Sequence, residues 1–238
     1  MQLFNRIYQV SGDLTGLTTD VQGAMWNDCN SYVVRLDDGL VLFDAGCGDT
    51  MDQLMDNVRY WGMDPGDIAY CFLTHAHYDH AGGGHILKER GVHIVAGPET
   101  ADAVQAGDHR CCGYLYHKTF NPFEVDTVLG DGEHISVLGL QITARAMPGH
   151  SQGCTVYSFE MDGKQVLISG DVIGTKLVGD FGWSGSIDFC RKAYLESLLR
   201  MTELDVDCML PGHGMVYFSG AKRRIEEVLN TALMEWRQ

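Results

Sequence analysis

One run of seven residues constrains this chain more than any other feature. It reads Thr-His-Ala-His-Tyr-Asp-His over residues 74–80 and directly follows an apolar run at residues 68–73. No ordinary packing requirement places three imidazoles and a carboxylate within six residues. Imidazole and carboxylate are, however, good ligands for borderline metal ions such as zinc. We therefore interpret the run as part of a metal site, and a metal site needs further ligands from elsewhere in the chain.

Three remote residues are candidates for these further ligands. His150, Asp171 and His213 each follow an apolar run, and each has glycine beside it. Glycine lets the backbone approach closely because it has no Cβ. Taken singly, each could be a turn residue. Taken with the run at 74–80 they complete a donor set large enough for two metal ions: His75, His77, Asp79, His80, His150, Asp171 and His213.

The pattern of apolar residues predicts the fold class. We expect two groups of strands, with helices between and after them. The expected strands are residues 3–10, 31–36, 40–43, 68–73 and 92–96, then 124–128, 134–137, 140–146, 155–160 and 164–169. The expected helices are residues 49–61, 80–90, 99–106, 187–201 and 219–236. Two strand-rich halves with interleaved helices predict an α/β protein, a four-layer αββα sandwich, with residues 1–238 forming a single domain.

Composition excludes some partners. The 32 acidic and 17 basic residues give a formal net charge of −15, which repels a phosphate backbone and argues against nucleic-acid binding. No segment approaches the roughly 20 apolar residues of a membrane span. The eight cysteines are scattered without a CxxC pair, and we find no signal peptide, so reduced thiols in the cytoplasm are expected. Adjacent Cys111 and Cys112 could be reactive or could be filler.

The His-x-His-x-Asp-His run and the remote His, Asp and His, in this order, resemble the metallo-β-lactamase superfamily. The resemblance extends over nearly the whole chain and is strongest to the branch with glyoxalase II and lactonase-type hydrolases. It implies the αββα fold, with the site at the mouth between the sheets. It also implies that His75, His77 and His150 bind one metal, that Asp79, His80 and His213 bind a second, and that Asp171 bridges both. Asp44 matches a family position that orients a ligand from behind.

This ligand set predicts the chemistry. Two metal ions, expected to be zinc with iron or manganese as alternatives, can share a water and lower its pKa toward neutrality. The bridging hydroxide would attack a small activated ester of the thioester or lactone type, and Asp79 would carry the proton. A mononuclear iron persulfide dioxygenase of the same fold is the alternative. The resemblance also allows a homodimer.

The substrate stays open at this point. Lactonases of the family place a tyrosine shortly after the bridging aspartate, whereas Val172-Ile173-Gly174 follows Asp171 here. Aromatic residues on irregular segments often line a small-molecule site, although core packing is the alternative. On that basis the candidates for substrate binding are Tyr114, Tyr116, His117, Phe181 and Trp183.

Overall fold

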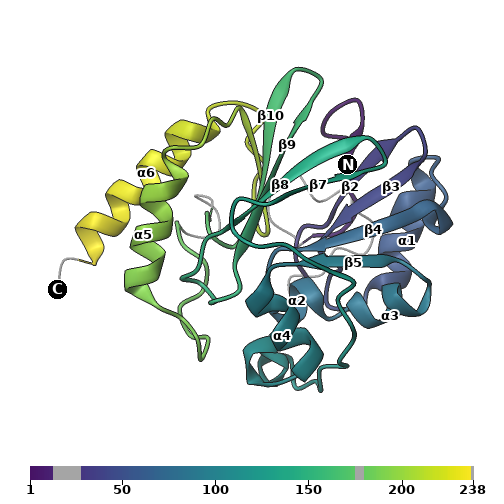
Figure 1. Ribbon diagram of the computed structural model, residues 1–238, viewed down its shortest axis with the longest axis horizontal. Helices are drawn as coiled ribbons and strands as arrows, with labels where there is room; N and C mark the ends of the chain where they lie inside the picture. The colour runs from purple at the N-terminus through teal and green to yellow at the C-terminus, as the bar shows by residue number, and fades with distance from the viewer. Residues whose placement is uncertain (13–27, 175–179, 237–238) are drawn as a thin grey trace.

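The computed structural model describes residues 1–12, 28–174 and 180–236, and its strands form two sheets (Figure 1). The first sheet has the order β1-β2-β3-β4-β5-β6, with β1 Ile7–Gln9, β2 Tyr32–Leu36, β3 Gly39–Phe43, β4 Ile68–Leu73, β5 His93–Ala96 and β6 Thr127–Val128. The second has the order β11-β10-β9-β8-β7, with β7 His134–Val137, β8 Leu140–Ala146, β9 Thr155–Met161, β10 Lys164–Gly170 and β11 Cys208–Pro211.

Helices cover the outer face of each sheet (Figure 1). The first sheet is covered by α1 Met51–Tyr60, α2 Tyr78–Ala81, α3 Gly84–Glu89 and α4 Pro98–Ala106. The second is covered by α5 Arg191–Met201 and α6 Ala221–Glu235. No helix within the described ranges combines the length and apolarity that crossing a membrane requires.

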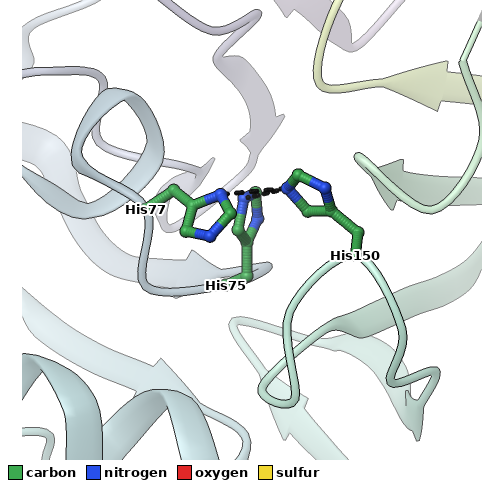
Figure 2. A group of neighbouring side chains, drawn as sticks. All are labelled: His75, His77 and His150. Atoms are coloured by element: carbon green, nitrogen blue, oxygen red, sulfur yellow. Dashed lines mark hydrogen bonds between the residues drawn. The ribbon is translucent and has the colours of Figure 1, made fainter. Parts of the chain in front are cut away.

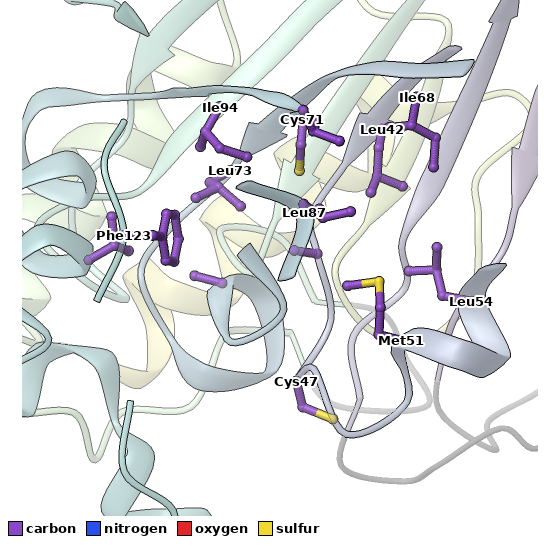
Figure 3. Packing of buried hydrophobic residues seen from close by; sticks show 14 of the residues in the cluster. Leu42, Cys47, Met51, Leu54, Ile68, Cys71, Leu73, Leu87, Ile94 and Phe123 are labelled. Atoms are coloured by element: carbon purple, nitrogen blue, oxygen red, sulfur yellow. The ribbon is translucent and has the colours of Figure 1, made fainter. Parts of the chain in front are cut away.

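Alternating side chains along the strands build three apolar layers. Phe72 of β4 points between the sheets, where it meets Tyr157 of β9 at a ring distance of 5.3 Å. Its neighbours Cys71 and Leu73 point the other way, into the layer shared with α1 and α3 (Figure 3). Because successive strand residues face opposite sides of a sheet, strands buried on both faces produce this arrangement. The predicted four-layer sandwich is confirmed; the prediction of a single domain stays a prediction.

Several predicted boundaries were wrong. The strand expected at residues 3–10 is limited to Ile7–Gln9, and the amphipathic segment 187–201 becomes helical only at Arg191. The helix expected at 80–90 is divided into α2 and α3 at Gly82 and Gly83, where Gly83 N donates to the Gly46 carbonyl oxygen at 2.9 Å. No bounds were predicted for strand β11, although the apolar run before His213 indicated that a strand ends there.

Candidate metal centre

The carboxyl ends of strands β4, β8, β10 and β11 meet at one edge of the sandwich. His75 and His77 lie in the loop after β4, and α2 then presents Asp79 and His80. The other three residues follow their strands in the second sheet: His150 after β8, Asp171 after β10 and His213 after β11. Of the seven candidate donors, Asp171 and His213 are partly exposed and the other five are buried. The structure therefore brings together the complete predicted donor set.

Three imidazoles converge on one point (Figure 2). His150 Nε2 lies 2.9 Å from His77 Nδ1 and 3.2 Å from His75 Nε2. With zinc–nitrogen bonds of 2.0–2.1 Å, two nitrogens on a tetrahedral ion are about 3.3 Å apart. The spacing of the three nitrogens is thus that of ligands around a single ion.

A second group lies beside the first. His213 Nε2 is 3.0 Å and His80 Nε2 is 3.6 Å from Asp79 Oδ2. Asp171 stands between the groups, with Oδ1 at 3.3 Å from His80 Nε2 and Oδ2 at 3.5 Å from His150 Nε2. Oδ2 also lies 3.6 Å from His213 Nε2, so the Asp171 carboxylate contacts both groups.

Unpaired buried atoms point to a cation in the second group. His80 Nε2 and Asp171 Oδ1 are buried and have no hydrogen-bond partner among the described residues. A buried polar atom without a partner is destabilising by about 1–3 kcal/mol. A cation held between the nitrogen and the oxygen would satisfy both, so the donor set fits a metal ion.

The protonation states also suit metal binding, which requires neutral imidazoles and ionised carboxylates. Burial lowers the pKa of His75 and His150, and it lowers the pKa of His77 to about 3. Burial alone would raise the pKa of Asp79, but His80 and His213 lower it to about 2. Asp171 likewise has a pKa well below its usual range, since His213 and His80 outweigh its burial.

His80 differs from the other three buried histidines. Burial alone would lower the pKa of His80, but Cys29 and then the Asp171 carboxylate raise it well above its usual value. In the absence of another cation, a proton on His80 offsets the negative charge around it. The carboxylates of Asp44, Asp79 and Asp171, at 2.8, 3.6 and 3.3 Å from His80, thus favour a positive charge in the second group.

Asp44 orients His80 from behind. Its Oδ2 lies 2.8 Å from His80 Nδ1 and accepts from Thr74 Oγ1 at 2.8 Å, while Oδ1 accepts from Thr74 N at 2.7 Å. A proton on Nδ1 leaves the Nε2 lone pair directed at Asp79 and Asp171, as in carboxylate–histidine–metal arrangements. Asp44 has a φ of 59°, a left-handed conformation that aspartate and asparagine tolerate better than most residues.

The segment after Asp180 orients His150. His150 Nδ1 lies 2.9 Å from the Trp183 carbonyl oxygen, to which it donates, so Nε2 is left free to bind. The fully buried Tyr194 of α5 holds this segment: its hydroxyl accepts from Gly182 N at 2.9 Å and contacts Val172 O at 2.8 Å. Sequence analysis missed Tyr194, because its position in the amphipathic pattern of α5 indicates only a core residue.

A cavity of about 430 Å³ opens over both groups. Of the residues proposed for substrate binding, Tyr116, Phe181 and Trp183 line it. Tyr114 and His117 are not among the described residues that line this cavity, and a part for them in substrate binding stays a prediction.

The adjacent cysteines have different surroundings. Cys112 lines the cavity, and burial raises the pKa of its thiol to about 11, so the thiol is neutral at pH 7. The buried Cys111 thiol donates instead to the Ala103 carbonyl oxygen at 3.3 Å. Cys111 is therefore part of the packing against α4.

Comparisons with known proteins agree with this geometry. A family model described as the metallo-beta-lactamase superfamily matches residues 24–213. An acyl-coenzyme A thioesterase, MBLAC2 of Gallus gallus, is 28% identical and aligns with 83% of this chain and 76% of its own length. A hydroxyacylglutathione hydrolase of Pseudomonas entomophila is 32% identical over 49% of this chain and 38% of its own.

Solved structures share the fold. A motif mutant of a metallo-beta-lactamase from Cronobacter sakazakii superposes with a TM-score of 0.77 and covers 99% of this chain and 94% of its own. Its sequence identity is 20%, so this likeness concerns the fold alone.

Proposed function

The chain belongs to the metallo-beta-lactamase superfamily, and from this premise we propose that it is a dinuclear metal-dependent hydrolase of a small activated ester, of the thioester or lactone type. The similar chicken thioesterase and bacterial hydroxyacylglutathione hydrolase support hydrolysis as the reaction class. Zinc is the ion we expect, because imidazole and carboxylate donors suit it.

The position of Asp171 is the observation that carries the proposal. Its Oδ1 lies 3.3 Å from His80 Nε2, and its Oδ2 lies between the two groups, 3.5 Å from His150 Nε2 and 3.6 Å from His213 Nε2. One carboxylate in this position can be shared by two ions. His75, His77 and His150 would hold the first ion, and Asp79, His80 and His213 the second, with Asp171 shared. When bound, two divalent ions lower the pKa of a shared water and polarise the carbonyl under attack.

The chain's own residues would hold the substrate and move the proton. Asp79 lines the cavity and is ionised at neutral pH, so it can accept the proton that the attacking water loses and pass it to the leaving thiolate or alkoxide. Asp44 and the Trp183 carbonyl oxygen would keep His80 and His150 in the tautomer that binds a metal.

Metal content and activity test the proposal together. Elemental analysis of the purified protein should give close to two zinc ions, or two other divalent ions, per chain. Asp171→Ala and His77→Ala should each abolish hydrolysis of a thioester and lactone panel, while His134→Ala, at an exposed histidine of β7, should not. One iron per chain, with oxygen uptake on glutathione persulfide, would instead identify the dioxygenase. Full activity of Asp171→Ala would refute the site assignment.

A further inference from the structure

Beyond the metal-facing residues, the cavity wall is apolar. Two chain segments form it, one after α4 and one after β10. Their contributions are Cys112, Leu115 and Tyr116, and then Ile173, Gly174, Phe181, Gly182 and Trp183. No lysine or arginine occurs among the described residues that line the cavity. The wall thus offers contact area without a group that would balance a negative charge.

The nearby cations are engaged elsewhere. In the segment around η3 and η4 (His109–Cys111 and Gly113–Tyr116), Arg110 pairs with Asp108 at 2.7 Å and Lys118 pairs with Asp49 at 3.0 Å. Neither cation lines the cavity. Away from the metal-facing residues, a negative charge on the substrate would therefore meet no cationic side chain among the described residues of the wall.

Arg224 of α6 is buried behind the wall. Its guanidinium donates to the Gly174 carbonyl oxygen at 3.0 Å and pairs with Asp180 at 2.5 Å. Only 3% of its side chain is exposed. The charge of Arg224 is therefore used to hold the two ends of the segment 174–180 rather than to bind a ligand.

The mouth of the cavity exposes large apolar side chains. Leu115 is 44% exposed and Trp183 is 48% exposed, and both line the cavity. Apolar side chains that remain exposed around a concave site commonly mark the place where an apolar ligand binds. A volume of about 430 Å³ is within the range of small-molecule sites.

Building on the proposed hydrolase function, we propose that the cavity wall binds the acyl part of the substrate and that this acyl part is an uncharged alkyl chain. An acyl group that ends in a carboxylate would have to bury its charge against Leu115, Ile173 and Phe181. Burying a charge without a partner is unfavourable by several kcal/mol. The site should therefore strongly prefer an acyl chain that ends in a methyl group over one that ends in a carboxylate.

A matched pair of substrates tests this. S-phenyl thiohexanoate and the S-phenyl monothioester of adipate have acyl chains of equal length and differ in ending with a methyl group or a carboxylate. We expect kcat/KM to be at least about a hundredfold higher for the methyl-ended thioester. Along the series from butanoate to octanoate it should rise about fourfold per methylene until the cavity is filled. Equal rates, or a preference for the carboxylate, would overturn the proposal.

Binding without turnover separates this inference from the proposed function. The purified protein can be titrated calorimetrically with 1-butanol, 1-hexanol and 1-octanol. Its affinity for the alcohol should rise with chain length even if no ester is hydrolysed. Leu115→Ser should weaken hexanol binding severalfold. Leu199→Ser, a change at a similarly exposed leucine of α5 outside the cavity lining, should not. A flat series, or equal effects of the two substitutions, would refute the apolar site.

One lysine needs its own control. Lys176 lies outside the described residues, between Gly174 and Asp180 in the sequence. In Lys176→Met the ratio of rates for the two thioesters should equal that of the unmodified protein. A preference for the carboxylate-ended thioester that disappears in Lys176→Met would overturn the proposal.

Discussion

Replacing Asp44 with asparagine should weaken metal binding at the second group through His80. Asparagine tolerates the left-handed backbone of this position, so the φ of 59° can persist. The amide, however, offers one acceptor where the carboxylate offers two. If its oxygen keeps the bond from Thr74 N, its NH₂ group faces His80 Nδ1. His80 then accepts on Nδ1 and carries its proton on Nε2, the atom directed at Asp79 and Asp171.

The magnitude follows from the bonds that change. Removing such an orienting partner typically weakens metal binding by about 10–100-fold. In the alternative rotamer the oxygen of the introduced asparagine faces His80 and the amide NH₂ faces Thr74 N, a buried donor. Leaving Thr74 N without an acceptor should lower the free energy of unfolding by about 1–3 kcal/mol. With a melting shift of about 2–4 °C per kcal/mol at this chain length, the Tm of the metal-free protein should fall by about 2–12 °C.

A matched variant separates stability from metal binding. Asp28 is also buried and accepts from Ser11 Oγ, Cys47 N and Thr50 Oγ1, but it contacts none of the proposed metal ligands. Asp28→Asn should therefore lower the Tm while metal affinity, measured by competition with a chromophoric chelator, stays unchanged. If Asp44→Asn binds two metals as tightly as the unmodified protein, His80 does not depend on Asp44 and the reasoning is refuted.

Three further predictions concern the same centre. In Gly182→Ala the Cβ would lie 2.5 Å from both Asp171 O and His150 Nδ1. Competition with a chelator should therefore show metal binding weakened at least about tenfold. The control Gly130→Ala, where the nearest atom would be 3.5 Å away, should bind metal as the unmodified protein does. Tyr194→Phe removes the acceptor for Gly182 N, and calorimetry should record about 1–3 kcal/mol lower stability. In the metal-free protein, burial lowers the pKa of His77 to about 3 against about 6.5 in an unfolded chain. Between these values the unfolded chain binds the extra proton, so the free energy of unfolding should decrease as pH falls, by up to about 1.4 kcal/mol per unit. In urea titrations at a series of pH values, the free energy of unfolding should decrease less steeply for His77→Ala than for the unmodified protein.

The seven candidate donors could be singled out from sequence because each is marked locally. Four of the seven residues lie in one run, and the remote three each follow an apolar strand with glycine beside them. In a layered fold, strand ends that carry such residues meet at one edge. The sequence therefore predicted that these seven residues come together, and the structure places them within a few ångströms of one another.

The boundaries that failed depend on contacts between distant segments. Strand β11 has four residues, all buried, and it exists because it pairs in parallel with β10. Its sequence has no alternation that would distinguish it from a buried helix. At the break between α2 and α3 the helix bonds to the backbone of a distant segment, since Gly83 N donates to Gly46 O at 2.9 Å and His80 O accepts from Ala45 N at 2.7 Å. Neither contact can be read from the segment that it shapes.

The cavity wall was predicted less well for a geometric reason. Tyr114 and Tyr116 lie in one turn of 3₁₀ helix, Gly113–Tyr116. With three residues per turn, positions i and i+2 point in different directions, so only Tyr116 lines the cavity. His117 follows with a φ of 53°, which ends the helix. Ile173 gave no signal in the sequence, since an apolar residue after a strand is equally suited to the core.

The segment from Phe181 to Ser186 links the wall to the metal centre, but through different atoms. Its backbone serves His150, because the Trp183 carbonyl oxygen accepts from Nδ1. Its side chains Phe181 and Trp183 serve the cavity. A carbonyl oxygen is present whatever side chain the residue bears, so Trp183 can change while His150 stays oriented. The wall can therefore vary while the candidate donors keep their arrangement, which is why the sequence predicts a cluster of donors that the structure brings together but does not predict the substrate.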